Sequence, residues 1–213
     1  MSDITSRAID TLQAVDIIAC EDTRHSGSFL KKIDVKKKLV SYHEFNESER
    51  ASQLLSELKS GKNIAVITDA GSPGISDPAY RIVKIAVEND IEIIPLPGPT
   101  ALIPALTASG LPTDRFFFEG FLSNKKAARQ KRLSQLVDFP HTILFYESPH
   151  RIEKMIADVL EVFGNRQVCV AREISKKFEQ FLRGDAESVL AQIKAKPLKG
   201  EIVVVVEGNR DKK

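Results

Sequence analysis

Two apolar runs constrain the fold of this chain more than any other feature of its sequence. Residues 64–67 read Ile-Ala-Val-Ile, and residues 202–206 read Ile-Val-Val-Val-Val, with no alternation of polar and apolar positions. A strand that is apolar at every position is buried on both faces, as in the middle layer of a parallel sheet. Other short β-branched runs alternate with longer segments of helical period, and this alternation predicts an α/β fold with largely parallel sheets.

The periodicity predicts the positions of the individual elements. The expected strands cover residues 15–20, 39–42, 63–68, 91–95, 116–121, 142–146, 167–171, 178–183 and 201–207. The expected helices cover residues 4–14, 26–32, 47–60, 78–89, 99–108, 125–137, 149–163 and 186–195.

A domain boundary is expected near Gly110-Leu111-Pro112-Thr113. Before this point strands and helices alternate regularly. After it, the expected strand at 178–183 follows another strand directly, which indicates an antiparallel pair and a mixed sheet. We therefore expect two α/β lobes, residues 1–111 with a parallel sheet and residues 112–213 with a mixed sheet, and a ligand cleft between them.

Composition limits the classes of protein that the chain can represent. Hydrophobic residues make up 42% and charged residues 28% of the 213 residues, which is typical of an ordinary globular protein. No apolar stretch approaches the roughly 18 residues of a membrane helix, and the N-terminus has no signal-peptide pattern. Cys20 and Cys169 lie inside apolar runs, which favours buried free thiols in a reducing compartment. These features predict a soluble, cytoplasmic protein that does not bind a membrane.

The loops that follow the expected strands carry the candidate binding residues, because ligands of open α/β sheets bind at the carboxyl ends of the strands. Residues 69–78 read Asp-Ala-Gly-Ser-Pro-Gly-Ile-Ser-Asp-Pro. This loop is longer than a strand-to-helix turn requires, its glycines allow a ligand to approach the backbone closely, and the carboxylate of Asp69 can accept hydrogen bonds. A second rigid loop, Pro97-Gly98-Pro99-Thr100-Ala101, opens the next expected helix.

Charged and titratable clusters follow four further expected strands. They are Glu21-Asp22-Thr23-Arg24-His25, His43-Glu44, Glu147-Ser148-Pro149-His150-Arg151 and Arg172-Glu173. A single cluster of this kind is usually explained as a solvated loop. Four clusters at equivalent strand ends indicate that this edge of the expected sheets binds a ligand or substrate. The histidines do not have the spacing of a metal site, so no metal is expected. The dinucleotide-binding, Walker and nucleophile-elbow motifs are absent from the sequence, which weakens dinucleotide-dependent oxidoreductase, NTPase and hydrolase functions.

One expected helix is strongly basic. Five positive charges fall within residues 125–132, with no acidic residue among them, although the net charge of the whole chain is only +2. A solvated helix face normally mixes both signs of charge, whereas clustered cations contribute salt-dependent affinity for phosphates. The candidate phosphate contacts are Lys125, Lys126, Arg129, Lys131 and Arg132.

The motifs, taken together, resemble those of the ribosomal RNA small subunit methyltransferase I group within the tetrapyrrole methylase superfamily. The segments that carry the resemblance are 21–24, 69–78, 97–101, 145–151 and 171–173, and it extends from about Asp3 to Gly208. It implies a two-lobed homodimer that binds S-adenosylmethionine in the cleft between its lobes. The implied reaction is methyl transfer to the 2′-hydroxyl of a cytidine in the decoding region of 16S rRNA, in the small ribosomal subunit.

The resemblance also assigns residues of this chain to roles. The implied cofactor contacts are Asp69, Gly71, Ile75, Thr100, Ala101, Tyr146, Ala171, Leu198 and Gly200. For the catalytic set that faces the acceptor we expect Asp22, Arg24, His43, Glu147 and Arg151. In this set the arginines would hold phosphates, and either an acid or His43 would take the proton of the hydroxyl.

The chain departs from the pattern of this group at its start. Members open with a strand and a Pro-Ile-Gly-Asn-Leu loop, and an Asp-Ile-Thr-x-Arg-Ala helix follows. In this chain the segment that matches the helix is residues 3–8, which follow the first methionine almost directly. We therefore expect the first lobe to lack its first strand. Two alternatives stay open: methylation of a small tetrapyrrole of the precorrin type, and a non-catalytic ribosome-binding protein.

Overall fold

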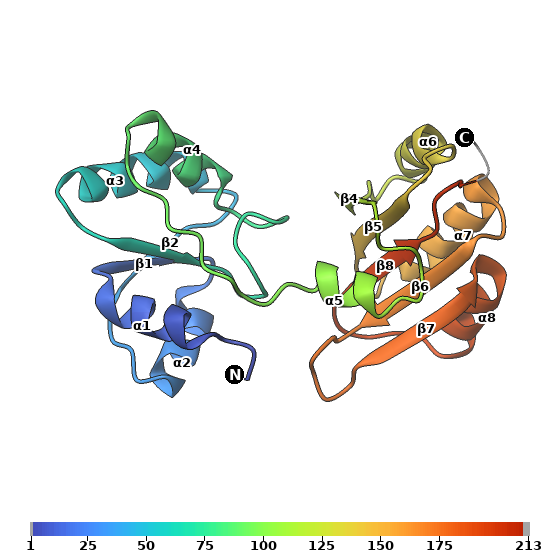
Figure 1. Ribbon diagram of the computed structural model, residues 1–213, viewed down its shortest axis with the longest axis horizontal. Coiled ribbons are helices and arrows are strands. Elements are labelled where there is room, and N and C mark those ends of the chain that lie inside the picture. The colour runs from blue at the N-terminus through green and yellow to red at the C-terminus, as the bar shows by residue number, and fades with distance from the viewer. Residues whose placement is uncertain (1, 211–213) are drawn as a thin grey trace. The chain divides into compact units, whose positions relative to one another are not determined.

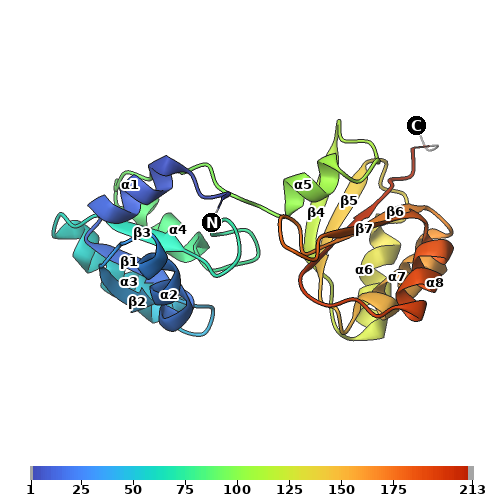
Figure 2. The same cartoon turned by 90° about the horizontal axis from the view of Figure 1, so that it is seen from below.

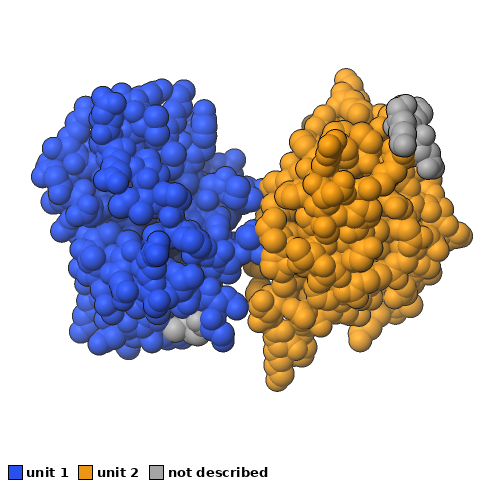
Figure 3. Space-filling model, in the orientation of Figure 1, with its two compact units in different colours: residues 1–100 blue, residues 101–213 orange. Residues whose placement is uncertain are grey.

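A computed structural model describes residues 2–210 of the protein. The chain divides into two compact units, residues 1–100 and residues 101–213 (Figures 1 and 3). The elements of the first unit are α1 (Ser6–Ala14), β1 (Ile17–Cys20), α2 (Thr23–Lys32), β2 (Lys38–Ser41), α3 (Glu47–Lys59), β3 (Ile64–Ile67) and α4 (Tyr80–Glu88). The strands alternate with helices, as the periodicity predicts.

The sheet of the first unit is parallel and three-stranded, in the order β2-β1-β3. Apolar side chains of β1 point to both faces, which explains its uniformly buried sequence. Ile18 packs with Leu12 and Leu30 of α1 and α2 on one face, while Ile17 packs with Leu54 and Ile82 of α3 and α4 on the other. The first unit is therefore a three-layer α/β structure.

The strand predicted for residues 91–95 does not form, and this prediction is wrong. Within residues 2–210, β3 pairs only with β1, so no strand is available at its other edge. All four residues of β3 remain partly accessible, and Ile94 is 70% exposed. An apolar β-branched segment becomes a strand only when a neighbouring strand offers the backbone hydrogen bonds of a ladder.

The second unit contains α5 (Leu102–Thr107), β4 (Phe116–Phe121), α6 (Lys126–Leu136), β5 (Thr142–Glu147), α7 (Ile152–Phe163), β6 (Gln167–Arg172), β7 (Gln180–Asp185), α8 (Ala186–Ala195) and β8 (Ile202–Val206). Its five-stranded sheet has the order β4-β5-β8-β6-β7. Strands β4 and β5 are parallel, whereas the other pairs are antiparallel. The predicted α/β class, with a parallel first sheet and a mixed second sheet, is confirmed.

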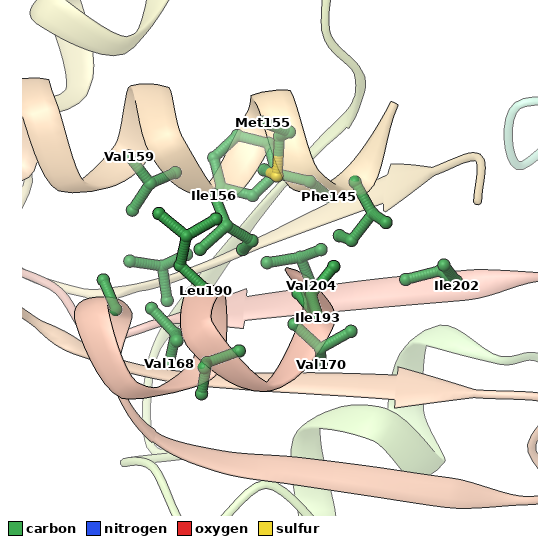
Figure 4. Close-up of a cluster of buried hydrophobic side chains, with 14 of the residues drawn as sticks. Phe145, Met155, Ile156, Val159, Val168, Val170, Leu190, Ile193, Ile202 and Val204 are labelled. Carbon is green, nitrogen blue, oxygen red and sulfur yellow. The ribbon is translucent and has the colours of Figure 1, made fainter. Parts of the chain in front are cut away.

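The two faces of the second sheet are covered unequally. Helices α6, α7 and α8 cover one face and bury Phe145, Ile156 and Val204 in the larger core (Figures 2 and 4). The short helix α5 covers part of the opposite face, where Ala105 and Leu106 pack against the sheet. Because α5 belongs to this core, residues 101–111 lie with the second unit, whereas the sequence pattern assigned them to the first lobe.

Both cysteines are free and buried, which confirms the prediction of buried thiols. Burial raises the pKa of Cys169 to about 11 and also raises the pKa of Cys20, so both sulfurs are neutral thiols at physiological pH. No helix within residues 2–210 is long and apolar enough to cross a membrane.

Candidate functional site

The carboxyl ends of the three strands of the first unit meet at one edge of its sheet. All three strands are parallel, and Cys20 is aligned with Ser41 on one side and with Ile67 on the other. The predicted residues Asp22, His43 and Asp69 each follow one of these strands by a few positions. The fold thus brings three polar groups that are far apart in the sequence to the same edge.

Asp22 caps the N-terminus of α2. Its Oδ1 accepts hydrogen bonds from the backbone N–H of Arg24 at 2.7 Å and of His25 at 3.3 Å, and the guanidinium of Arg24 lies 3.1 Å from its Oδ2. Hydrogen bonds from the Arg24 side chain and from the two backbone N–H groups lower the pKa of Asp22 to about 2. A carboxylate with so low a pKa is a weak base, and Asp22 is therefore a structural cap that positions the exposed Arg24.

His43 is held by the loop that follows it. Its backbone N–H donates to Asn46 Oδ1 at 2.9 Å, and its Nε2 lies 3.1 Å from Asn46 Nδ2. Since that amide nitrogen can only donate, Nε2 accepts, and Nδ1 then carries the proton in the neutral ring. Nδ1 is buried and has no hydrogen-bond partner among the described residues. The imidazole therefore offers one unused polar atom near the strand ends.

Asp69 carries a second unused polar atom. Its Oδ1 is buried without a hydrogen-bond partner within the described part of the chain, while its Oδ2 lies 3.9 Å from Nδ1 of His25. An unsatisfied buried carboxylate oxygen costs free energy unless a ligand supplies a donor. His25 was not among the predicted site residues. The charged cluster after β1 is the sequence signal for it, but only the fold shows its proximity to Asp69.

The two glycine- and proline-rich loops of the first unit contact each other. Ser72 Oγ donates a hydrogen bond of 2.9 Å to the carbonyl of Pro99. Gly71 has a φ of +94°, and a Cβ at this position would lie 3.4 Å from the same carbonyl oxygen and 4.0 Å from Cα of Thr100. The left-handed backbone conformation, more than the space around it, favours glycine at this position. Asp69, Gly71 and Thr100 are thus brought together, and Ile75 is exposed on the first of these loops. Ala101, with which the second unit begins, is also exposed.

The predicted cofactor residues of the second unit fall into two groups. Tyr146 and Ala171 lie in one row of the sheet, on either side of Val203, and share the face that α5 partly covers. Leu198 is instead buried in the core under α8. Gly200 has a φ of +87°, and a Cβ there would overlap the carboxylate of Glu173. Leu198 and Gly200 therefore have structural roles in shaping the start of β8.

Glu147 and Arg151 form an ion pair in which the carboxylate is buried and the guanidinium is partly exposed. Arg151 Nε lies 3.1 Å from Glu147 Oε1, and the Glu147 side chain is 1% exposed. Burial raises the pKa of Glu147, against the lowering effect of the backbone N–H of Ser148 and of Arg151. Arg151 also donates a 2.6 Å hydrogen bond to the carbonyl of Leu122. Both residues thus connect the loop after β5 to the loop after β4, and Glu147 has little access to a substrate.

The five cations predicted to contact phosphate have different environments. Arg129 is buried, and its Nε lies 2.6 Å from Asp158 Oδ2, so it is removed from the surface that a polyanion can reach. Arg132 forms a bidentate pair with Glu119, and Lys126 lies 3.3 Å from Glu161. Lys125 and Lys131 are exposed, and no ion pair is found for them within residues 2–210.

The described residues contain no group of three or more His, Cys, Asp or Glu side chains that could hold a metal ion. The polar edge of the first unit consists instead of single acidic and imidazole groups beside two glycine-rich loops. In an open α/β sheet this arrangement is typical of an enzyme that binds a small organic ligand at its strand ends.

The chain belongs to the tetrapyrrole (corrin/porphyrin) methylase family, which matches residues 1–190. It is therefore a methyltransferase. Similar proteins named ribosomal RNA small subunit methyltransferase I include one from Synechocystis sp. that is 46% identical over 98% of this chain and 75% of its own length. The protein of that name from Bacillus subtilis is 42% identical over 99% of this chain and 72% of its own length. The resemblance to this group, which the loop motifs indicate, is confirmed.

Solved structures support the same fold at much lower identity. The methyltransferase CobJ has a TM-score of 0.70 and 19% identity, covering 97% of this chain and 89% of that chain. The uroporphyrin-III-C-methyltransferase from Thermus thermophilus has a TM-score of 0.66 and 17% identity, covering 99% of this chain and 90% of that chain. These two similarities establish the architecture.

Proposed function

We propose that this protein is an S-adenosylmethionine-dependent methyltransferase that modifies the ribose 2′-hydroxyl of a cytidine in the decoding region of 16S rRNA. The observation that carries the proposal is the similarity to proteins named ribosomal RNA small subunit methyltransferase I. The protein of that name from Escherichia coli O157:H7, for example, is 44% identical over 99% of this chain. The resemblance includes the loops that follow β1, β3, β5 and β6, where an α/β enzyme binds its ligands.

The polar edge of the first unit fits the proposed cofactor. S-adenosylmethionine has an amino-acid moiety and a ribose, both rich in hydrogen-bond donors. The buried Asp69 Oδ1 has no partner among the described residues and can accept from such a donor. Gly71 and Thr100 lie close to each other, and their backbone groups can bind a ligand beside Asp69. We therefore retain Asp69, Gly71, Ile75, Thr100 and Ala101 as cofactor contacts, together with Tyr146 and Ala171 of the second unit.

The residues of this chain would act mainly by binding and orientation. When bound, S-adenosylmethionine supplies an activated methyl group on a sulfonium. The protein must place the ribose oxygen in line with that methyl group, and positioning of this kind accounts for much of the rate of two-reactant enzymes. We propose that Arg24 binds a phosphate of the RNA and that His43 hydrogen-bonds the substrate through Nδ1. We do not assign proton transfer to Asp22 or Glu147, because one has a low pKa and the other is buried in an ion pair.

The proposed phosphate contacts are fewer than the five cations expected from the sequence. Lys125 and Lys131 are the two exposed cations of this set for which no ion pair is found within residues 2–210, and we propose them as the main contacts. Lys126 and Arg132 contribute less because each has an acidic partner. Arg129 is left out because it is buried. We further propose that the protein acts in the cytoplasm as a homodimer on the small ribosomal subunit, as the resemblance implies.

Replacing Asp69 with alanine should weaken the binding of S-adenosylmethionine by at least about tenfold, the loss expected for a hydrogen bond to a charged group. Replacing the 91%-exposed Arg24 with alanine should leave cofactor affinity unchanged and lower methyl transfer to small ribosomal subunits. Calorimetric titration with S-adenosylmethionine and a methyl-transfer assay separate the two effects.

Both variants should show the circular dichroism spectrum of the parent chain, since Asp69 and Arg24 lie in loops and at a helix start. Equal cofactor affinity for Asp69→Ala and for the parent chain would contradict the assignment of Asp69. A loss of cofactor affinity in Arg24→Ala would contradict the proposed division between cofactor and RNA contacts.

A further inference from the structure

An exposed aromatic side chain lies at the end of β4 in the second unit. Phe121 is 57% exposed, and its ring centroid lies 5.6 Å from that of Tyr146, which in turn lies 4.8 Å from that of Phe118. These three rings, here called the aromatic cluster, come from the neighbouring parallel strands β4 and β5 (Figure 1). The two inner rings support the outer one, so the exposed ring of Phe121 has a defined orientation before any ligand binds.

The loop that follows Phe121 is held by two arginines, of which Arg129 is buried and Arg151 is partly exposed. Arg151 donates to the carbonyl of Leu122 at 2.6 Å, and Arg129 Nη1 donates to the carbonyls of Ser123 and Asn124 at 3.2 and 3.3 Å. Glu147 and Asp158 fix the two guanidinium groups in turn. Three successive carbonyls are therefore fixed from inside the unit. A surface organised in this way loses little conformational entropy when a ligand binds.

The charge around the aromatic cluster favours an anionic ligand. Lys125 is exposed at the end of the same loop, and no ion pair is found for it within the described residues. The carboxylates that neighbour the loop are neutralised, Glu119 by Arg132 and Glu147 by Arg151. An exposed aromatic ring beside a free cation is the combination by which proteins bind single-stranded nucleic acid, the ring stacking on a base and the cation contacting a phosphate.

We propose that Phe121 stacks on an unpaired base of the RNA substrate and that Lys125 contacts an adjacent phosphate. This inference deepens the proposed function, because it rests on RNA as the substrate and names a contact surface for it. Tyr146 and Phe118 act as positioning residues for the ring of Phe121. The charge of Lys125, at the N-cap of α6, then serves a surface at the carboxyl ends of β4 and β5.

The test compares the binding of two fluorescein-labelled probes to the full chain: a short single-stranded RNA, and the same RNA with abasic sites. We expect Phe121→Leu to bind the intact RNA about tenfold more weakly than the parent chain, at the lower end of the range for loss of one stacked base. Its affinity for the abasic RNA and the salt dependence of its binding should not change. Phe121→Tyr keeps an aromatic ring and should bind the intact RNA as the parent chain does.

Lys125→Gln provides a matched control with a different signature. It should weaken binding to the intact and abasic RNAs alike and reduce the slope of log affinity against log salt by about 0.7, the value for one phosphate of a single strand. Phe121 is largely exposed, so its variants should keep the stability of the parent chain, which thermal unfolding checks.

Three results would overturn the inference. One is equal affinity of Phe121→Leu and the parent chain for the intact RNA, and another is a parent chain that binds neither probe. The third is a changed oligomeric state of Phe121→Leu in size-exclusion chromatography, which would make Phe121 part of a protein interface. A methyl-transfer assay on the parent chain keeps the proposed function separate. If the chain binds RNA through Phe121 but methylates none, the proposed function fails and the stacking contact stands.

Discussion

Replacing Arg129 with methionine should lower the free energy of unfolding by about 3–5 kcal/mol, the loss typical when one partner of a buried ion pair is removed. The side chains of Arg129 and Asp158 are only 4% and 3% exposed, and their closest atoms lie 2.6 Å apart. The substitution leaves the Asp158 carboxylate buried, with Gln130 as a neutral donor and Lys126 as a more distant cation. It also frees the carbonyls of Ser123 and Asn124. Urea denaturation followed by circular dichroism measures the loss.

Two further variants show whether the effect comes from the unpaired charge. The double variant Arg129→Met/Asp158→Leu should recover most of the lost stability, because an apolar pair of similar volume often replaces a buried ion pair without loss. Lys131→Met, on the same helix but exposed, should change stability by less than about 0.5 kcal/mol. A loss below about 1 kcal/mol for Arg129→Met would contradict a structural role for Arg129 and restore it as a candidate RNA contact.

Replacing Phe145 with alanine should destabilise the protein by a similar amount, about 3–5 kcal/mol, the range for large-to-small changes in a packed core. Phe145 is fully buried at the centre of the larger core, where it packs among Met155, Ile156 and Val204 (Figure 4). The alanine variant loses the apolar contacts of the ring and leaves a cavity that helices on one side and the sheet on the other can fill only in part. The shift of the urea midpoint at unchanged slope measures the loss.

Phe178 offers the matched control for this prediction. It is 62% exposed in the loop between β6 and β7, so Phe178→Ala removes the same atoms from a site that water already reaches. Its effect on stability should stay within about 0.5 kcal/mol. Comparable losses for the two alanine variants would contradict the assignment of Phe145 to the centre of the core.

The parts of the fold that depend on local pattern could be predicted from the sequence. The β-branched runs at residues 64–67 and 202–206 form β3 and β8, and both lie in the predicted sheets. Burial on both faces is confirmed for β8 but is wrong for β3, whose four residues all stay partly accessible. The expected antiparallel pairing of β6 and β7 also occurs, because the short connection between them leaves no room for a crossover helix. The strand predicted at residues 91–95 fails for the opposite reason, since its formation requires a partner strand that no local pattern can report.

Candidate ligand-binding positions could also be predicted, but their individual roles could not. The loop sequence marks Asp69 and Gly71, and the fold brings them together with Thr100 from another loop. Sequence alone could not show that Asp22 caps a helix, because a carboxylate before a helix and a catalytic carboxylate look the same. Nor could it show that Arg129 is neutralised by Asp158, which lies on another helix. Both distinctions depend on tertiary contacts.

Incubation of the full chain with methyl-labelled S-adenosylmethionine and small ribosomal subunits that lack this modification tests the proposed function most directly. We expect the label to enter 16S rRNA at the 2′-oxygen of a cytidine, where it makes the neighbouring phosphodiester resistant to alkali. Labelling of a precorrin-type tetrapyrrole in place of RNA would contradict the proposal. So would the absence of label from the RNA when the chain is folded and binds S-adenosylmethionine.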